Sequence, residues 1–500
     1  MRIYDLLELN SVLYPTHSAV EIVDGPQVTY QELKNRVSRI AAGLRDMGIE
    51  SGSRVVLVAE NGLSYFDIFL STAHIGAAAV PINTHLVYSE MEYIVKNSDP
   101  ALIFADEVFV QQLKSMEVAP VVSLDGPEYE KLTEIETSLT CESSEEDIAL
   151  IIYTSGTTGR PKGACLTQRG LTFNAVTTAE VQEFQHEDVF LSSTPLYHAA
   201  AGTRVVSMLA DGQTHVVLSK FDPDSWLSTV ERYRVTIAVL VPTQMRQILE
   251  HENLNNYDLS SLRLLVYGAA PSPGPLVEKA YKELNCGLYQ GYGISECVTS
   301  LTALLPQDHV LAMTKRPELL GSCGRPVPGV YIEIRNKNGG LVKCGEVGEI
   351  WVLTEKVMAG YWNDEIQTAK VLKDGWFRTG DLAHQDEEGY LFIVGRKTDM
   401  LISGGVNIYP SEIEEVLCHH PKIKEVAVVG VSDSNWGERP VAYVKTDGDC
   451  EMLELRKFCE KSLSTIKVPD YFFFVSEFPR TATGKIRKVD LRKMAEESTK

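Results

Sequence analysis

The 500-residue sequence lacks the features that mark membrane-spanning, disulfide-rich or exported proteins. No apolar run reaches the roughly 18 uncharged residues that a bilayer span needs, and the N-terminus has no continuous apolar stretch of signal-peptide length. The nine cysteines are scattered and contain no C-x-x-C pair. This pattern argues against a disulfide framework or a cysteine-rich zinc site and predicts a reducing, cytoplasmic location.

Basic side chains are scarce as well, with 47 Lys and Arg against 68 Asp and Glu and a net charge of −21. Nucleic acid is therefore not an expected partner. The deficit is uneven, because residues 396–500 hold 17 basic and 17 acidic side chains, which leaves 30 basic and 51 acidic ones in residues 1–395. The neutral C-terminal part can approach an anionic ligand without strong repulsion.

The remaining composition is that of a globular protein long enough for more than one domain. Helical and strand patterns alternate over the first 290 residues, as where the Thr29 and Glu32 capping box opens a helical repeat before the strand "SRVVLVAEN". Two layered α/β subdomains are expected. Residues 320–395, rich in glycine and short alternating runs, predict a small antiparallel β module.

After residue 395 the α/β pattern returns, with Ser411 and Glu414 at capping-box spacing. We therefore expect a large N-terminal domain over 1–395, a hinge at 396–399 and a small, mobile α+β domain over 400–500 that acts as a lid.

One glycine-rich stretch, "IYTSGTTGRPKG" at 152–163, is built to bind phosphate. It is not a Walker A loop, because the second required glycine falls on Pro161. Glycines let backbone N–H groups converge on anionic oxygens, hydroxyls donate further hydrogen bonds, and a lysine adds positive charge. The residues concerned are Thr154, Ser155, Gly156, Thr157, Thr158, Gly159 and Lys162.

This stretch resembles the signature of the adenylate-forming superfamily, which contains acyl-CoA synthetases, adenylation domains and beetle luciferases. Seven more segments resemble the family's successive motifs in the same order: "STPLYHAAAG", "YGAAPSP", "QGYGISE", "GEVGEI", "GWFRTGDL", "GRKTDMLISGGVNIYPSEIEE" and "PRTATGKIRK". The resemblance spans essentially the whole chain, and so many motifs in order make it specific.

The resemblance implies an ATP-dependent acid–CoA ligase, in which a carboxylate attacks the α-phosphate of ATP, pyrophosphate leaves, and the acyl group passes from AMP to coenzyme A. It assigns Mg²⁺ to Glu296 with Thr154, since that ion prefers hard oxygen ligands. Besides the loop, the expected ATP and AMP contacts are Gly268, Ala269, Ala270, Gln290, Gly291, Tyr292, Gly293, Ser295, Asp381 and Arg396.

Individual roles follow from the same resemblance. Asp381 is expected to accept both ribose hydroxyls, which suits a carboxylate because it offers only acceptors. Tyr292 is expected to stack on adenine, Gln290 to reach its amine, and Arg396 to reach the ribose or phosphate edge. Lys485 is expected to stabilise charge as the acyl-adenylate forms.

The acyl pocket is expected at His198, Thr243, Gly268, Gly291 and Ile294, with His198 as the gate at its carboxylate end. Amino-acid adenylation domains usually carry an aspartate in the "PLYHAAAG" region, and none stands here. An ammonium group would be buried there unpaired, which disfavours an amino-acid substrate. Fatty acids and aryl acids both remain open.

Coenzyme A is the expected acceptor, through Gly404, Gly405 and Trp436. An enzyme that loads an acyl carrier protein is the nearest alternative, while a luciferase-type oxygenase or an inactive nucleotide-binding protein are less favoured. Thr398 departs from the residue types common at the family's hinge, so the pivot within 396–399 is open, as is a homodimer.

Overall fold

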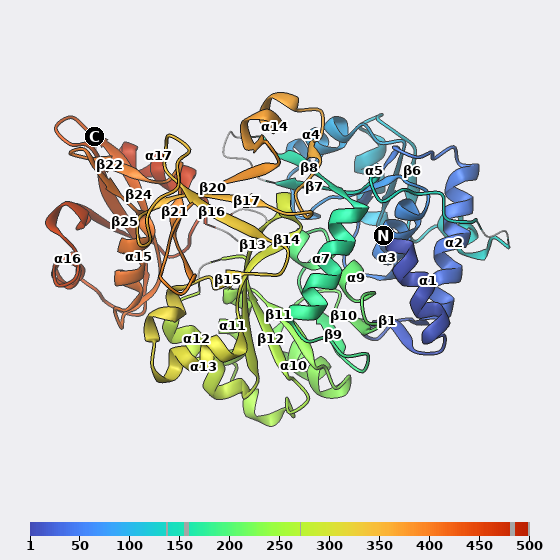
Figure 1. The fold of residues 1–500 in the computed structure, drawn as a ribbon, viewed down its shortest axis with the longest axis horizontal. Helices are drawn as coiled ribbons and strands as arrows, with labels where there is room; N and C mark the ends of the chain where they lie inside the picture. Colours follow the sequence, from blue (N-terminus) through green and yellow to red (C-terminus); the bar gives the residue numbers. More distant parts are fainter. Residues whose placement is uncertain (137–138, 155–159, 271, 481–485, 499–500) are drawn as a thin grey trace.

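The computed structural model describes residues 1–136, 139–154, 160–270, 272–480 and 486–498. Its ribbon shows a large body and, in orange and red at the left, a smaller C-terminal unit (Figure 1). Within the described ranges, no helix combines the length and the apolar character needed to cross a membrane.

A nine-stranded sheet forms the middle of the body, in the order β15-β14-β13-β12-β11-β9-β10-β1-β2. Its central strands run parallel, and β2, β14 and β15 are antiparallel additions at the two edges. The central strands are short apolar runs, as expected for parallel strands covered on both faces. The bounds are β1 Ser18–Ile22, β2 Gln27–Thr29, β9 Val189–Ser192, β10 Thr214–Val217, β11 Ile237–Leu240, β12 Leu264–Gly268, β13 Gly287–Ile294, β14 Thr299–Leu304 and β15 Arg325–Pro326.

A second, seven-stranded sheet has the order β18-β8-β7-β4-β3-β5-β6. Its strands from β7 to β6 are parallel, and β8 and β18 extend it antiparallel at one edge. The bounds are β3 Arg54–Val58, β4 Ala78–Pro81, β5 Leu102–Ala105, β6 Val121–Ser123, β7 Ile148–Thr154, β8 Lys162–Thr167 and β18 Gly360–Tyr361.

Helices lie between the two sheets and on both outer faces, and this arrangement confirms the predicted pair of layered α/β subdomains. One apolar core joins both sheets through α1 Ile3–Leu13, α2 Tyr30–Asp46, α3 Leu63–His74, α7 Gln168–Val181 and α9 Arg204–Ser207. The outer face of the nine-stranded sheet is covered by α10 Pro223–Arg232, α11 Pro242–Leu249, α12 Gly274–Leu284 and α13 Pro306–Thr314. The outer face of the other sheet is covered by α4 Tyr88–Ser98 and α5 Glu107–Lys114. The remaining helices of the body are α6 Pro127–Glu134, α8 Ala199–Gly202 and α14 Glu365–Val371.

Helix α2 begins at the predicted capping box. The Glu32 amide donates to Thr29 Oγ1 at 3.3 Å, and the Thr29 amide donates to Glu32 Oε2 at 2.8 Å. The predicted apolar stripe, including Leu33, Val37 and Ile40, is fully buried. Local sequence signals and core packing agree here, as a uniquely folded helix requires.

The predicted β module is also confirmed, as a five-stranded antiparallel sheet with β16, β17, β20 and β19 in order and β21 paired to β20. Its bounds are β16 Tyr331–Arg335, β17 Gly348–Leu353, β19 Leu372–Lys373, β20 Trp376–Gln385 and β21 Leu391–Arg396. The β20–β21 pair sets Asp381 directly opposite Arg396.

The C-terminal unit is a five-stranded sheet packed with helices. Its strands are β22 Leu401–Ser403, β23 Val406–Ile408, β24 Ile423–Asp433, β25 Gly437–Thr446 and β26 Tyr471–Phe474, and its helices are α15 Pro410–Cys418, α16 Met452–Glu460 and α17 Lys488–Ser498.

The capping box predicted at Ser411 and Glu414 is wrong. Helix α15 has Tyr409 as its N-cap, and Ser411 donates instead to the Val394 carbonyl. The Glu414 carboxylate accepts from the Val428 amide at 2.7 Å and from Lys488 Nζ at 2.6 Å. Tertiary partners therefore outcompete the local cap.

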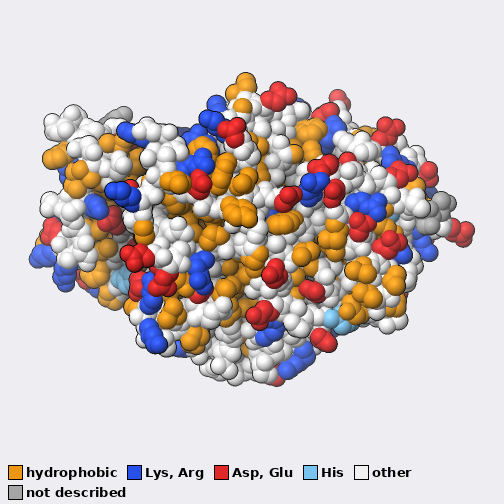
Figure 2. Space-filling view, viewed as in Figure 1, with side chains coloured by type: hydrophobic (Ala, Val, Ile, Leu, Met, Phe, Trp, Pro, Cys, Tyr) orange, Lys and Arg blue, Asp and Glu red, His pale blue; other side chains and the backbone are white. Residues whose placement is uncertain are grey.

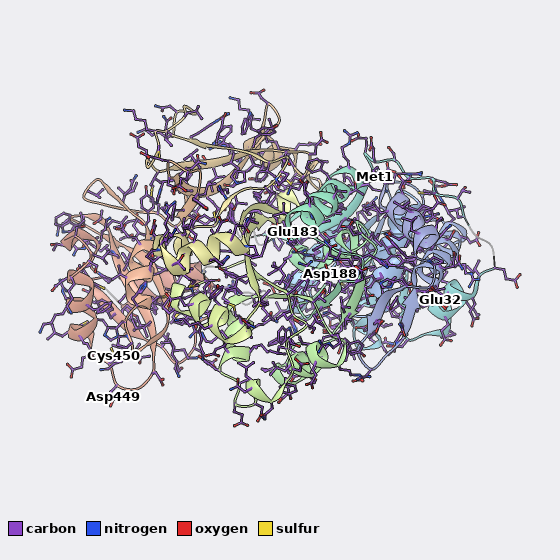
Figure 3. The ribbon with its side chains drawn as sticks, turned by 60° about the horizontal axis from the view of Figure 1, so that its bottom comes forward. Met1, Glu32, Glu183, Asp188, Asp449 and Cys450 are labelled. Carbon is purple, nitrogen blue, oxygen red and sulfur yellow. The ribbon has the colours of Figure 1, made fainter. Side chains whose placement is uncertain are left out.

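A buried carboxylate ties the start of β9 to the neighbouring strands. Asp188, labelled beside Glu183 in Figure 3, accepts from Arg263 Nε at 2.8 Å and from Thr236 Oγ1 at 2.7 Å. Burial alone would raise the pKa of Asp188, but these hydrogen bonds lower it overall. On the face drawn in Figure 2, acidic and basic side chains are interspersed with apolar ones.

Buried neutral histidines should make the fold sensitive to acid. His309 is fully buried, with 2.8 Å from Nε2 to the Tyr267 hydroxyl and from Nδ1 to the Leu305 carbonyl. Burial lowers the pKa of His309 from 6.5 to about 4. Between these values the unfolded chain binds a proton that the folded chain excludes, so stability falls as the pH decreases. At pH 5 this histidine should lower the free energy of unfolding by about 2 kcal/mol.

Between pH 7 and pH 5, the free energy of unfolding of the native chain should fall by about 2 kcal/mol more than that of His309→Gln, because glutamine does not titrate. Urea unfolding at both pH values measures this difference. Equal declines in the two proteins would contradict the assignment.

Candidate active site

The predicted nucleotide residues gather where strands β12 and β13 end. Hydrogen bonds join β13 and the short helix η2 Ser295–Cys297 to the β7–β8 hairpin on one side and to β20 on the other. In open α/β sheets, ligands bind at the carboxyl ends of the parallel strands. The β module lies over this edge and completes the site.

Glu296 lies between the two sheets of the body. Its Oε1 accepts from Thr154 Oγ1 at 3.4 Å and from the Tyr361 hydroxyl at 2.9 Å, and its carbonyl accepts from the Met358 amide at 2.8 Å. The structure thus brings together the two predicted metal ligands, Glu296 and Thr154.

Sequence reasoning missed Tyr361. It stands on β18, which pairs with β8, and burial raises its pKa, with the negative charge of Glu296 adding to the rise. Lys162 Nζ lies 4.9 Å from the centre of the Tyr361 ring. A lone tyrosine far along the chain from Glu296 gives no local signal of this contact.

The phosphate-loop residues Ser155, Gly156, Thr157, Thr158 and Gly159 lie outside the described residues. Their flanking residues are described, and Thr154 is the register partner of Lys162 across the β7–β8 hairpin. The ends of the loop are therefore held together beside Glu296.

The predicted ribose carboxylate is buried in a polar cluster. Asp381 is 4% exposed, accepts the Tyr292 hydroxyl on Oδ2 at 2.6 Å, and pairs through Oδ1 with Arg396 Nε at 2.6 Å. Burial alone would lower the pKa of Arg396, but the charge of Asp381 raises it overall. Burial and Asp381 both raise the pKa of Tyr292. The guanidinium is charged and the phenol protonated at neutral pH.

Close backbone approach shapes the predicted adenine slot. Gly268 is the register partner of Gly291, and a Cβ on Gly268 would stand 2.3 Å from the Gly291 carbonyl oxygen. Ala269 has a positive φ of 64°, which is uncommon outside glycine and is concentrated at functional sites. Ala270 and Gln290 flank the same slot, and Gln290 Oε1 accepts from the Tyr267 hydroxyl at 3.4 Å.

The acyl-pocket residues come from separate segments. His198 is the N-cap of α8 and is partly exposed, with its ring 4.6 Å from the ring of Tyr197. Ile294 ends β13, directly before Ser295 and Glu296. Thr243 is exposed in the first turn of α11. Their roles stay predictions.

The residues predicted to meet coenzyme A lie together in the C-terminal unit. The Gly404 amide donates to the Trp436 carbonyl at 2.7 Å, and a Cβ on Gly404 would stand 2.8 Å from the Trp436 ring. Trp436 is 45% exposed. Gly405 follows with a φ of 81°, so both glycines turn the β22–β23 hairpin beneath an accessible indole. Lys485 lies outside the described residues.

The proposed hinge is a tight turn at the end of β21. The amides of Asp399 and Met400 donate to the Arg396 carbonyl at 3.0 and 3.2 Å. The Lys397 amide donates to the Gly380 carbonyl at 2.9 Å. The turn therefore starts at the residue that pairs with Asp381.

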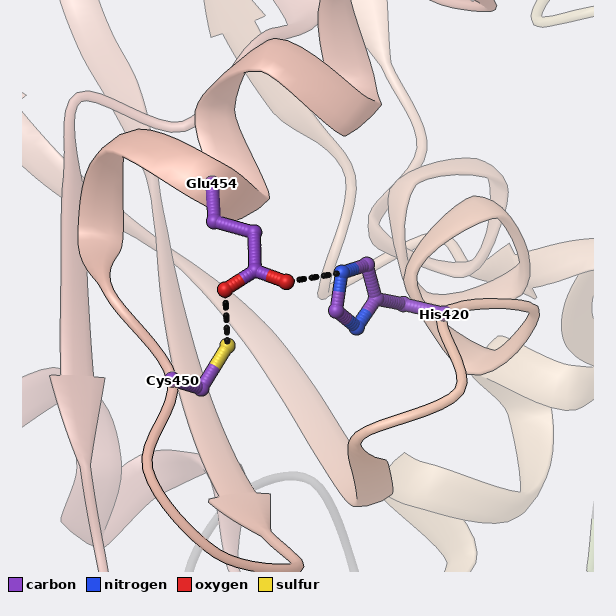
Figure 4. A group of neighbouring side chains, drawn as sticks. All are labelled: His420, Cys450 and Glu454. Carbon is purple, nitrogen blue, oxygen red and sulfur yellow. Dashed lines mark hydrogen bonds and ion pairs between the residues drawn. The ribbon is translucent and has the colours of Figure 1, made fainter.

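A second group of metal-ligand types lies in the C-terminal unit, away from these residues: His420, Cys450 and Glu454 (Figure 4). Glu454 Oε2 already accepts from Lys422 Nζ at 2.8 Å, and His420 Nδ1 accepts the Lys422 amide at 3.3 Å. An imidazole that accepts at Nδ1 keeps its proton on Nε2, where it faces Glu454 at 3.5 Å. These side chains are therefore held by hydrogen bonds and ion pairs to one another and to Lys422.

Comparison with known proteins now identifies the family. The family model described as AMP-binding enzyme matches residues 8–362, and the one described as AMP-binding enzyme C-terminal domain matches residues 412–485. The chain belongs to the AMP-binding enzyme family.

Its relatives cover it from end to end. The chain is 35% identical to an indoleacetate–CoA ligase of Aromatoleum aromaticum, covering 100% of this chain and 99% of that one. It is 36% identical to a feruloyl-CoA synthase of Amycolatopsis sp., over 94% of each. The o-succinylbenzoate CoA synthetase of Bacillus subtilis, solved with its acyl-adenylate intermediate, superposes with a TM-score of 0.88 at 29% identity, covering 98% of this chain and 97% of that one.

These comparisons confirm the predicted superfamily, fold class and enzyme class, an ATP-dependent acid–CoA ligase that works through an acyl-adenylate.

Two glycines of the same strand should respond differently to substitution. A Cβ on Gly293 would stand 1.4 Å from the Thr299 carbonyl oxygen, whereas one on Gly291 would make only ordinary contacts at 3.5 Å. We expect Gly293→Ala to destabilise the chain by about 3 kcal/mol or more and Gly291→Ala by about 1 kcal/mol or less. Thermal unfolding measures both, and equal losses would show that the turn after β13 yields readily.

Proposed function

We propose that the acid is an aryl acid and that the residues gathered at the strand ends carry both half-reactions. One observation carries the assignment of both half-reactions to these residues: two separate carboxylates meet at one sheet edge. Glu296 lies beside the phosphate loop, and Asp381 pairs with Arg396. The named relatives act on indoleacetate, ferulate and succinylbenzoate, all of which contain an aromatic ring.

In the first half-reaction a carboxylate oxygen bonds to the α-phosphorus of ATP, and the bond to the leaving pyrophosphate breaks. Asp381 accepts the ribose hydroxyls, a role that suits a carboxylate because it offers only acceptors. The adenine lies against the backbone of Gly268 and Gly291, with Tyr292 and Gln290 at its sides. Fixing the ribose and base in this way aligns the α-phosphate for attack.

Glu296 and Thr154 fit Mg²⁺, because both present hard oxygen atoms and these lie 3.4 Å apart. When bound, the ion screens the charge between phosphates. Tyr361 holds the Glu296 carboxylate in place through its hydroxyl, and Lys162 adds a cation over the tyrosine ring.

The reacting carboxylate and the phosphate are both anions, so donors must be aimed at the charge as it develops. We assign this to Lys485, with His198 closing the carboxylate end of the acyl pocket. In the second half-reaction the thiol sulfur bonds to the acyl carbon, AMP leaves, and the thiol proton passes to water. The nine free cysteines agree with a reducing, cytoplasmic setting.

We further propose that the two half-reactions use two orientations of the C-terminal unit about a hinge at 396–399, with residues 1–395 and 400–500 as the two domains. One orientation presents Lys485, and the other presents the Gly404–Gly405 hairpin with Trp436 as the contact for coenzyme A.

The proposal is tested by assaying a panel of aryl and aliphatic acids for pyrophosphate release with and without coenzyme A. Aryl acids should be activated with the highest kcat/KM and converted to free thioesters. Pyrophosphate release without thioester formation from free coenzyme A would instead support the carrier-protein alternative.

Lys485→Ala should slow acyl-adenylate formation by about 10²- to 10³-fold, because one donor to the transition state is lost. Lys488→Ala is the matched control, since Lys488 pairs with Glu414 and should change the rate by less than about threefold. Single-turnover formation of acyl-AMP measures both. An unchanged rate in Lys485→Ala would refute the assignment.

Trp436→Ala should raise the KM for coenzyme A by about tenfold, the loss expected for one aromatic contact, and leave ATP–pyrophosphate exchange unchanged. The indole is exposed and supports no buried core, so the fold should be retained. Equal losses in exchange and thioester formation would place Trp436 outside the second half-reaction.

A further inference from the structure

On the face of the nine-stranded sheet that turns toward α7 and α9, one apolar side chain in the middle of the sheet is not fully buried. Val239, in the central strand β11, stays partly exposed, although its neighbours Ala238 and Leu240 are fully buried on the other face. Val239, Val266 and Tyr289 are register partners across three strands and so share one face. Gly291 lies two residues beyond Tyr289, about 7 Å farther along β13.

Arg204, at the start of α9, lies at the lower end of this face and is 8% exposed. Its guanidinium carbon lies 5.4 Å from the centre of the Phe190 ring, on the neighbouring strand β9, and its Nη1 donates to Gln182 Oε1 at 2.9 Å. Among the residues that the structure describes, no carboxylate pairs with Arg204.

Tyr289 and Ser300 connect Arg204 to the predicted acyl pocket. Burial raises the pKa of Tyr289, and the positive charge of Arg204 opposes this rise. A Cβ on Gly291 would stand 3.5 Å from both Ser300 Oγ and the Tyr289 ring. Tyr289 therefore lies next to Gly291 and close enough to Arg204 to sense its charge.

A buried guanidinium needs an anion. Burial lowers the pKa of Arg204 to about 10, so the group stays charged at neutral pH. Gln182 satisfies one of five N–H donors and neutralises no charge. The remaining donors form the fork that matches a carboxylate in a bidentate pair.

We propose that the acyl pocket ends at Arg204 and that the acid carries a second carboxylate, which Arg204 binds at the end remote from the reacting carboxylate. The inference deepens the proposed function and rests on it, because it concerns the same acyl pocket. The substrate class is then a dicarboxylic acid with an aromatic ring between its two acid groups.

The test compares phenylacetate, phenylpropanoate and phenylbutanoate with the same acids carrying a para carboxylate or, as a neutral match, a para carboxamide. Pyrophosphate release gives kcat/KM for each. We expect the best dicarboxylate to exceed its carboxamide by about 30- to 100-fold, the range for one charge-assisted bidentate pair.

Arg204→Met should abolish this preference and lower kcat/KM for the dicarboxylate by about 30- to 100-fold. It should raise kcat/KM for the plain acid, because the aromatic ring of that substrate no longer faces an unpaired cation. Gln182→Glu supplies an internal carboxylate to Arg204, so it should also abolish the preference while raising the melting temperature. This second variant keeps the test decisive if Arg204→Met fails to fold.

Three results would overturn the inference: equal kcat/KM for dicarboxylates and carboxamides in the native chain, equal losses for all acids in Arg204→Met, or an intact preference in Gln182→Glu. If only the plain aryl acids caused pyrophosphate release, the inferred second carboxylate would be wrong and the proposed function would stand. Release from no aryl acid would overturn the proposed function itself.

Discussion

The pairing of Asp381 with Arg396 across β20 and β21 is the contact on which the rest of the site depends. It fixes the carboxylate predicted to bind the ribose and, on the opposite strand, the residue at which the predicted hinge turn begins. Because the antiparallel register sets both residues, a nucleotide bound at Asp381 as proposed would act directly on the residue at which the turn toward the C-terminal unit begins. In the proposed mechanism, nucleotide binding and domain orientation are coupled through this ion pair.

Charge sets the second constraint. Residues 1–395 carry 51 acidic against 30 basic side chains, and this body must nevertheless bind ATP and a carboxylate. The long-range field of the body cannot attract these anions, so neutralisation must be local. In the proposed mechanism, Lys162 in the body, Arg396 at the hinge and Lys485 in the C-terminal unit supply it, together with a divalent ion at Glu296. If Lys485 acts as proposed, adenylation requires the orientation of the C-terminal unit that presents this lysine.

The sequence predicted what local pattern and motif order encode, and missed what depends on tertiary contact. The Thr29 cap was predictable because both of its partners lie within one helical turn. The cap at Ser411 and Glu414 was wrong because Val428 and Lys488, distant in sequence, bind the Glu414 carboxylate more favourably. Glu296 and Asp381 were predicted as site residues from their motifs, whereas Tyr361 lies in no motif and is brought to Glu296 by the pairing of β18 with β8.

Two buried cations below the strand ends show why Arg204 requires an anion. Lys356 is 1% exposed and donates to the Ser300 carbonyl, and burial lowers its pKa to about 8. A buried lysine can therefore relieve its desolvation cost by losing a proton near neutral pH. A guanidinium does not deprotonate in proteins, so Arg204 keeps its charge under the same burial. With Gln182 as its only hydrogen-bond acceptor among the described residues, the charge is balanced only when an anion enters from the pocket.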